Sequence, residues 1–200
     1  MRNRSIYTLI IIGLLLLAVS CQAKTAEEES VIQEETPPAA ATMTAQPPTD
    51  NQPSSSGLRA TLEAPSSLPQ GEPLKVRFTL ANESESDLYV LNWFTPLEGL
   101  GGDIFRVTRD GQRIRYQGPQ ASRGDPTPEA YTLIEAGGMA SAEVDLSLAY
   151  DFSQPGNYTI EFISPNQSHV AHAEAEMARS VDELGPVEMP SNQVVVAIGA

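Results

Sequence analysis

Two histidines, His169 and His172, come closest in type and spacing to metal-binding residues, and Glu174 and Glu176 follow them. Imidazole and carboxylate groups are common metal ligands, and residues three apart share one face of a helix. A zinc hydrolase needs a glutamate directly after the first histidine, whereas this segment reads His-Val-Ala-His. The spacing supplies no third ligand, and no serine stands between glycines as in a nucleophile elbow. We therefore expect no catalytic residue, metal site or cofactor, and a polar loop or helix over residues 168–183.

Cys21 is the only cysteine, which excludes an internal disulfide. Arg2 and Arg4 precede an apolar run over residues 6–19, and this order is typical of a signal peptide. The run of about fourteen residues is too short for a hydrocarbon core of about 30 Å. The position of Cys21 resembles a bacterial lipobox, although Ala18 stands where leucine is more usual. That resemblance implies a lipidated, palmitate-bearing Cys21 after removal of residues 1–20. The alternative is an ordinary signal peptide with an incidental cysteine.

The residue that follows Cys21 bears on where the anchor resides. It is Gln22 and not aspartate, which resembles the sorting signal for the outer membrane of Gram-negative bacteria. Stable anchoring takes more than one acyl chain. We expect a protein of the bacterial cell envelope, held at the outer membrane by lipid.

Composition separates a tether from a folded domain. Residues 22–56 contain no aromatic side chain, five prolines and clustered glutamates, so they cannot bury enough apolar surface to fold. We expect a disordered tether over residues 21–56 and one domain over residues 57–200. The formal net charge of −14 excludes a nucleic-acid groove, because phosphate binding requires lysine and arginine.

The domain shows the period-two alternation of half-buried strands. An Asp110-Gly111 turn joins two alternating runs and indicates a hairpin, and the residues 88–94 are apolar on both faces, as in a central strand. Further strands are expected over residues 74–80, 142–148, 158–162 and 194–198. Short strands separated by turn signals predict an all-β fold, an immunoglobulin-like antiparallel β-sandwich.

Tyr158 bears on that prediction. Asp151, Gly156 and Tyr158 stand in the order D-x4-G-x-Y at the start of a late strand. Immunoglobulin-like domains often place a tyrosine there, and its hydroxyl bonds to the backbone a few residues upstream. The alternative is an ordinary aromatic residue in a strand, and the sequence leaves both open.

Several segments of the domain together resemble a known protein module. They cover residues 90–99, 105–111, 116–119, 123–127 and 149–152. The set resembles the non-catalytic N-terminal β-domain of bacterial proteases in the deuterolysin/peptidyl-Lys metalloendopeptidase family. The resemblance covers roughly residues 58–198, and none of that family's catalytic residues has a counterpart among these 200 residues. It implies a non-enzymatic module that accompanies or restrains a protease.

Two hypotheses about function follow. The first is a lipid-anchored module that binds another protein, with a protease as one candidate, through loops and a hairpin, since loops often carry function. Its candidate contacts are Trp93, Phe94, Leu97, Leu100, Asp103, Arg109, Arg113 and Arg115. The second is a structural or adhesive component that binds glycan or peptidoglycan through a sheet face lined by Tyr89, Trp93, Phe94 and Tyr116. The same aromatic residues would instead fill the core of an ordinary sandwich, and the exposure of Trp93 discriminates between the two.

Overall fold

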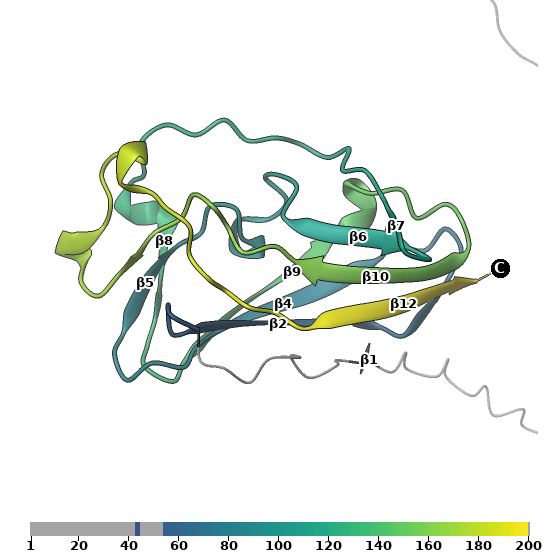
Figure 1. The fold of residues 1–200 in the computed structure, drawn as a ribbon, viewed down its shortest axis with the longest axis horizontal. Coiled ribbons are helices and arrows are strands. Elements are labelled where there is room, and N and C mark those ends of the chain that lie inside the picture. The colour runs from purple at the N-terminus through teal and green to yellow at the C-terminus, as the bar shows by residue number, and fades with distance from the viewer. Residues whose placement is uncertain (1–42, 45–53, 200) are drawn as a thin grey trace, which may run out of the picture. The chain divides into compact units, whose positions relative to one another are not determined.

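The computed structural model describes residues 43–44 and 54–199, and every regular element among them is a β-strand or a short 3-10 turn. The prediction of an all-β fold is therefore confirmed (Figure 1). Cys21 and nearly all of the expected tether lie outside the described residues, so lipidation and the tether stay predictions. Among the residues that are described, none belongs to a helix long and apolar enough to cross a membrane.

The first sheet has four antiparallel strands in the order β1-β2-β4-β9. The strands are β1 (Met43–Thr44), β2 (Leu58–Pro65), β4 (Lys75–Asn82) and β9 (Met139–Asp145). Buried and accessible residues alternate along β2 and β4, because successive side chains of a strand point to opposite faces. The alternation predicted over residues 74–80 is therefore confirmed.

The second sheet has five strands in the order β3-β12-β10-β6-β7. The strands are β3 (Ser67–Pro69), β12 (Gln193–Gly199), β10 (Gly156–Phe162), β6 (Phe105–Arg109) and β7 (Gln112–Arg113). The chain leaves β2 and crosses to this sheet, where β3 runs parallel to β12. The predicted hairpin is β6–β7, and its turn residues Asp110 and Gly111 both have positive φ (47° and 83°).

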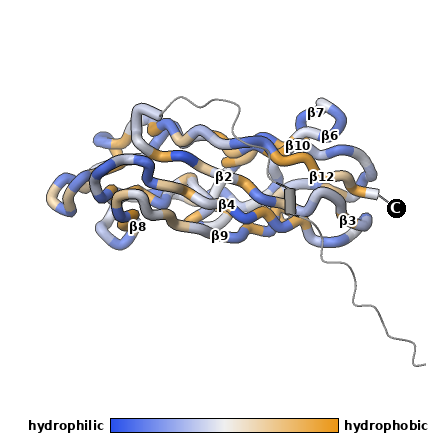
Figure 2. Tube along the Cα trace, turned by 90° about the horizontal axis from the view of Figure 1, so that it is seen from below, coloured by the Kyte–Doolittle hydropathy of each residue, from blue (hydrophilic) through white to orange (hydrophobic). Residues whose placement is uncertain are grey.

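The core lies between these two sheets, which form the predicted immunoglobulin-like sandwich. Phe78 of the first sheet and Phe162 of the second meet with ring centroids 4.9 Å apart, and Phe105 packs on Phe162 at 6.1 Å. All three side chains are buried. Figure 2 shows hydrophobic residues along β10 and β12. Burial of each large apolar side chain contributes about 1.5–3 kcal/mol, and the core is held together in this way without a disulfide.

Tyr158 forms the corner that the sequence left open. Its hydroxyl donates a hydrogen bond of 2.7 Å to the carbonyl of Gln154, four residues upstream. The ring is fully buried and packs on Phe152 at 4.9 Å. The order D-x4-G-x-Y therefore marks a tyrosine corner at the entry to β10.

A third, small sheet extends one end of the sandwich (left in Figure 1). It has the order β11-β5-β8, with strands β11 (Val170–Ala171), β5 (Leu88–Leu91) and β8 (Tyr131–Ile134). A second core cluster lies here and includes Leu91, Trp93 and Met177. The strand predicted over residues 88–94 is thus shorter than expected. It is central only in this small sheet and ends at Leu91, because the next residues turn into the 3-10 turn η1 (Pro96–Glu98).

The strand predicted over residues 142–148 is also displaced. Strand β9 ends at Asp145, whose carboxylate accepts a hydrogen bond of 2.9 Å from the backbone of Ser147 and starts the 3-10 turn η3 (Leu146–Leu148). The apolar alternation continues into this turn, and as a result Leu148 is 73% exposed. A capping carboxylate thus ends the strand earlier than the hydrophobic pattern indicates.

Gly156, which begins β10, packs too closely on the β6–β7 hairpin for any side chain. An added Cβ would lie 2.7 Å from Oδ2 of Asp110, and φ is +148°. We expect Gly156→Ala to lower the free energy of unfolding by about 2 kcal/mol, through backbone strain and displacement of Asp110. Urea unfolding measures the effect. The control is Gly124→Ala, where nothing lies within 4 Å, and a cost at Gly156 no greater than at Gly124 would contradict the prediction.

Candidate functional site

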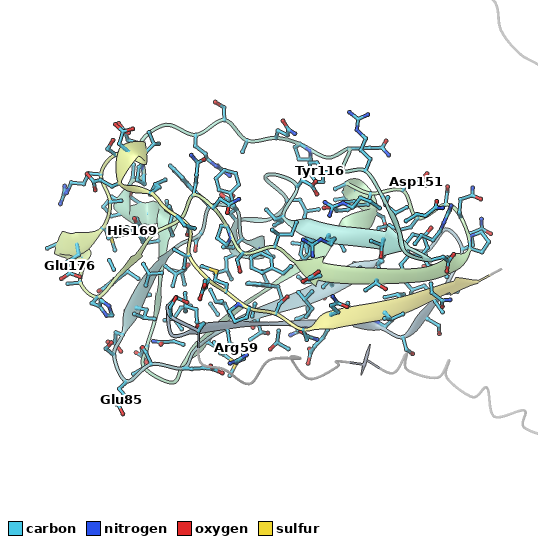
Figure 3. The ribbon with its side chains drawn as sticks, viewed as in Figure 1. Arg59, Glu85, Tyr116, Asp151, His169 and Glu176 are labelled. Carbon is cyan, nitrogen blue, oxygen red and sulfur yellow. The ribbon has the colours of Figure 1, made fainter. Side chains whose placement is uncertain are left out.

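A long segment without regular structure crosses one side of the sandwich, and we call residues 115–127 the strap (the teal coil along the top of Figure 1). Backbone hydrogen bonds of 2.8 Å hold it down, from Gln117 to the carbonyl of Ala149 and from Ala121 to the carbonyl of Gly101. Tyr116 lies at its beginning (Figure 3), where its hydroxyl donates to the carbonyl of Pro119. The strap is therefore fixed to the domain at several points.

Two adjoining hollows lie beside the strap, and together we call them the loop groove. Their volumes are about 360 Å³ and 300 Å³, and they share the residues Phe94, Ala121 and Gln167. The larger also contacts Gly102, Asp103, Ile163 and Pro165. The smaller also contacts Trp93, Arg123, Val181 and Leu184. The walls come from four separate loops, which the two core clusters hold in place.

Phe94 stands between the two hollows in a strained backbone conformation. Its φ is +57°, a region that bulky residues rarely adopt. Glu98 maintains this conformation, because one carboxylate oxygen accepts a hydrogen bond of 2.9 Å from the backbone of Phe94. Thr95 caps η1 in the same turn and accepts from the backbone of Leu97. Such strain costs about 1–3 kcal/mol and clusters at functional sites.

Arg123 of the strap forms one wall of the smaller hollow. Its guanidinium lies 2.6 Å from a carboxylate oxygen of Glu98 and stacks 5.5 Å from the ring centroid of Trp93. The Nε atom is buried and has no hydrogen-bond partner among the described residues. The Arg123-Gly124-Asp125 tripeptide belongs to this fixed strap, and Asp125 accepts a hydrogen bond from the backbone of Val181.

Asp103 connects the groove to the β6–β7 hairpin. Its carboxylate accepts a hydrogen bond of 2.7 Å from the hydroxyl of Tyr150 and forms an ion pair with Arg113 at 3.1 Å. Burial raises the pKa of the Tyr150 phenol, and the hydrogen bond to Asp103 raises it further. Tyr150 therefore stays a neutral hydrogen-bond donor at physiological pH. Its hydroxyl and the Arg113 side chain together fix the position of the Asp103 carboxylate.

The eight contact residues predicted from the sequence fall into three groups. Trp93, Phe94 and Asp103 line the loop groove, although Trp93 is only 9% exposed. Leu97 and Leu100 are half-buried and pack against the main core. The three predicted arginines, Arg109, Arg113 and Arg115, lie on or beside the hairpin. Arg109 is half-buried next to Gly156, and Arg115 is exposed.

The aromatic residues proposed for a glycan-binding sheet face do not form one surface. Trp93 is buried in the second cluster, where Tyr89 also packs, whereas Tyr116 meets Tyr150 edge-to-face, with ring centroids 5.4 Å apart, beside the main core. Phe94 touches both clusters. Trp93 is buried and the other three side chains are half-buried against these clusters, so the core interpretation of Trp93 agrees with the structure.

The two histidines face different neighbours. Nδ1 of His169 lies 3.2 Å from the hydroxyl of Tyr131, and Nδ1 of His172 lies 3.3 Å from that of Ser86. His169 lies at the end of the domain that carries the small sheet (Figure 3). Within residues 54–199, no three histidine, cysteine or acidic side chains gather as potential metal ligands. The segment 168–183 lies between β10 and β12 as predicted and contains β11 and two 3-10 turns, η4 (Glu174–Glu176) and η5 (Val181–Glu183).

The strain at Phe94 predicts an inverted order of stability. In Phe94→Gly and Phe94→Ala the ring is lost equally, but only alanine retains the steric conflict at positive φ. We expect the glycine variant to be the more stable by about 1 kcal/mol in urea unfolding. At Leu100, which is half-buried and has no positive φ, we expect alanine to be the more stable. The same order at both positions would contradict the interpretation of strain.

Comparison with known proteins gives one relative by sequence. No family model matches the chain. An extracellular protease of Aeromonas hydrophila is 29% identical over 132 residues, which are 65% of this chain. The chain spans 38% of the length of that protein. The chain is thus similar to part of a secreted protease.

Solved structures with a similar arrangement are distant. The CARDB domain of a Pyrococcus furiosus protein in complex with di-metal ions is 9% identical with a TM-score of 0.32, and 71% of this chain covers 87% of that chain. The ASH / PapD-like domain 7 of human CEP192 is 12% identical with a TM-score of 0.27, and 82% of this chain covers 98% of it.

Proposed function

We propose that this chain is a non-catalytic β-sandwich module of the kind that accompanies secreted bacterial proteases, and that it binds a protein, with a protease as the first candidate. The observation that carries the proposal is the similarity over 132 residues to an extracellular protease. The resemblance of the domain to the N-terminal β-domain of deuterolysin-type proteases supports it.

The geometry of the domain supports a binding role rather than a catalytic one. Loops from both core clusters meet at the loop groove, and rigid scaffolds commonly present binding residues on such loops. The ionisable side chains next to the groove are engaged in structural contacts: Glu98 with Arg123, and Asp103 with Tyr150 and Arg113. None of these groups is paired as a nucleophile with a base.

The direct test combines capture and inhibition. The purified full chain, biotinylated and kept in mild detergent, is mixed with secreted proteases of the source bacterium, and bound protease is identified by mass spectrometry. Casein hydrolysis by the captured protease is then measured with and without the chain. We expect saturable binding and a lower hydrolysis rate, and neither with the heat-unfolded chain. If the chain shows neither binding nor inhibition, the proposal is refuted.

The proposal includes a lipid anchor on Cys21 that holds the module at the outer membrane. The order of charges, apolar run and cysteine in residues 1–21 supports it. We expect Cys21→Ser to move the protein from the membrane fraction to the soluble fraction and to abolish labelling with palmitate. Wild-type protein found with a free thiol in the soluble fraction would contradict the anchor.

A further inference from the structure

We propose that residues 119–122 of the strap are a preformed, substrate-like peptide that enters the active-site cleft of a protease and restrains the enzyme by remaining there. This inference rests on the proposed function, because it names the part of the domain that a protease would bind. Four features of the strap support it: its extended course, its free backbone groups, its accessibility and the anchors on both sides.

The first feature is the course of the chain. The strap bends at Gly118 and at Asp125, and between them residues 119–124 run without a turn or a positive φ angle. Residues 119–122 are all exposed, and the strap forms the outer arc along the top of Figure 1. Protease clefts bind substrates as extended chains, and a segment already held in this form loses little conformational entropy on binding.

The second feature is the backbone of the segment, which is available for pairing with another chain. In the part of the chain that the structure describes, the N–H of Ala121 donates to the backbone of a neighbouring loop at 2.8 Å, and the carbonyl of Pro119 accepts from the Tyr116 hydroxyl. No such bond there involves the backbone N–H or C=O of Gln120 or Ser122. Free groups of this kind on an extended segment allow strand-like pairing with a partner.

The third feature is the space and chemistry around the segment. The two hollows of the loop groove, of about 360 Å³ and 300 Å³, open beside Ala121 and leave room for the walls of an enzyme cleft. None of residues 119–122 carries a charge, so no unpaired charge would be buried in the complex. The segment therefore suits a protease that accepts small or uncharged side chains, and not one that requires lysine or arginine.

The fourth feature is that the segment is fixed on both sides. On its N-terminal side, Gly118 packs so closely that an added Cβ would lie 2.7 Å from Cβ of Ala149. On its C-terminal side, the guanidinium of Arg123 lies 2.6 Å from a carboxylate oxygen of Glu98 and 5.5 Å from the ring centroid of Trp93. A cut within residues 119–122 therefore leaves both new ends attached to the folded domain.

These anchors change the result of hydrolysis. Overall, hydrolysis adds the OH of a water molecule to the carbonyl carbon of the cut bond and its remaining proton to the nitrogen, which leaves an acid and an amine. In a free peptide the two products diffuse apart. In the strap they stay close together, so the amine attacks the same carbon again and water leaves, because reactants held in place react at a high effective concentration. The segment thus occupies the cleft and is not consumed.

Subtilisin is a defined probe for this inference, because it is not itself the proposed partner and accepts many side chains. The full chain in mild detergent is titrated against subtilisin while hydrolysis of a small chromogenic peptide is recorded. Mass spectrometry locates the cuts within residues 54–199. We expect saturable inhibition and a first cut within residues 119–122, formed about a hundredfold more slowly than in a capped peptide with the sequence of residues 116–124.

Two variants test the segment and its anchor. Ser122→Pro removes a free backbone N–H, and we expect about tenfold weaker inhibition. Arg123→Ala removes the C-terminal anchor, and we expect about tenfold faster cutting of the segment. The matched control is Arg179→Ala, which changes an exposed arginine of another loop and should inhibit like the wild type. All variants retain residues 1–53, so cuts there affect them equally, and urea midpoints verify that each is folded. Ser122→Pro decides the test if Arg123→Ala is unstable.

The outcomes separate this inference from the proposed function. If Ser122→Pro captures and inhibits a protease of the source bacterium as well as the wild type does, the strap assignment is overturned and the module function stands. Cutting of the strap as fast as of the free peptide, a first cut elsewhere in residues 54–199, or equal inhibition of subtilisin by the wild type and Ser122→Pro would also overturn it. If subtilisin is inhibited as expected and no protease of the source bacterium is captured, the strap assignment is supported and the proposed partner is wrong.

Discussion

Replacement of Asn192 by leucine is expected to lower the free energy of unfolding by about 4 kcal/mol. The Asn192 side chain is fully buried. It forms hydrogen bonds to the backbone of β2 in the way that a neighbouring strand would. Its Oδ1 accepts a hydrogen bond of 2.7 Å from the backbone of Leu62, and its Nδ2 donates one of 3.0 Å to the carbonyl of Leu62. Leucine leaves both backbone groups buried and unpaired, and each costs about 1–3 kcal/mol.

Equilibrium unfolding in urea, followed by circular dichroism, measures this effect. The matched control is Gln193→Leu, which places the same side chain at the next, exposed position and should change stability by less than about 0.5 kcal/mol. Because Asn192 connects the start of β12 in one sheet to β2 in the other, we expect the loss to be global. A cost at Asn192 similar to that at Gln193 would show that water replaces the amide.

Asn82→Asp is expected to separate the small sheet from the sandwich and to lower the free energy of unfolding by about 4 kcal/mol. Asn82 lies where β4 ends, and its Nδ2 donates to the carbonyls of Ser86, Ile134 and Glu135 at 2.8, 3.0 and 3.1 Å. Its Oδ1 accepts from the backbone and the hydroxyl of Ser84. An ionised aspartate turns an oxygen toward these three carbonyls in a buried site, where an unpaired charge is strongly unfavourable.

Two probes distinguish local from global unfolding in this variant. Trp93 emission reports on the small sheet, because Trp93 belongs to its core cluster, and circular dichroism reports on all strands. We expect the emission transition of Asn82→Asp to move to lower urea than the circular dichroism transition, whereas the two coincide in the wild type. Ser84→Ala, which retains the amide of Asn82, should shift both only slightly. Coincident transitions at the wild-type midpoint would disprove the role of Asn82.

The sandwich could be predicted because its evidence is local in the sequence. Strand β4 alternates residue by residue, the turn at Asp110-Gly111 requires two positive φ angles, and Tyr158 has the spacing of a corner. The strand ends were less predictable. Strand β9 ends at the capping carboxylate of Asp145, and β5 ends before Trp93, although apolar residues continue past both points. Hydrophobic periodicity does not record such caps.

The loop groove could be predicted only in part, because it forms from segments far apart in the chain. Trp93, Phe94 and Asp103 were found because they lie together in one loop. Arg123 and Leu184 carry no signal of their own, since Arg123 reads as part of a turn until the strap is seen to cross over Trp93. The strain at Phe94 is equally invisible in the sequence, because it results from the hydrogen bond to Glu98.

The parallel pairing of β3 with β12 determines how the domain resists a mechanical load. A pull on residue 54 against residue 199 draws β2 and β3 in one direction and β12 in the other, along their own axes. The backbone hydrogen bonds that join them run from Ala197 to Ser66 and from Gln70 to Gly199. They are then loaded in shear at the same time and do not break one after another. Because forced unfolding is governed by the barrier rather than by the equilibrium, this pairing protects the domain against tension between those two points.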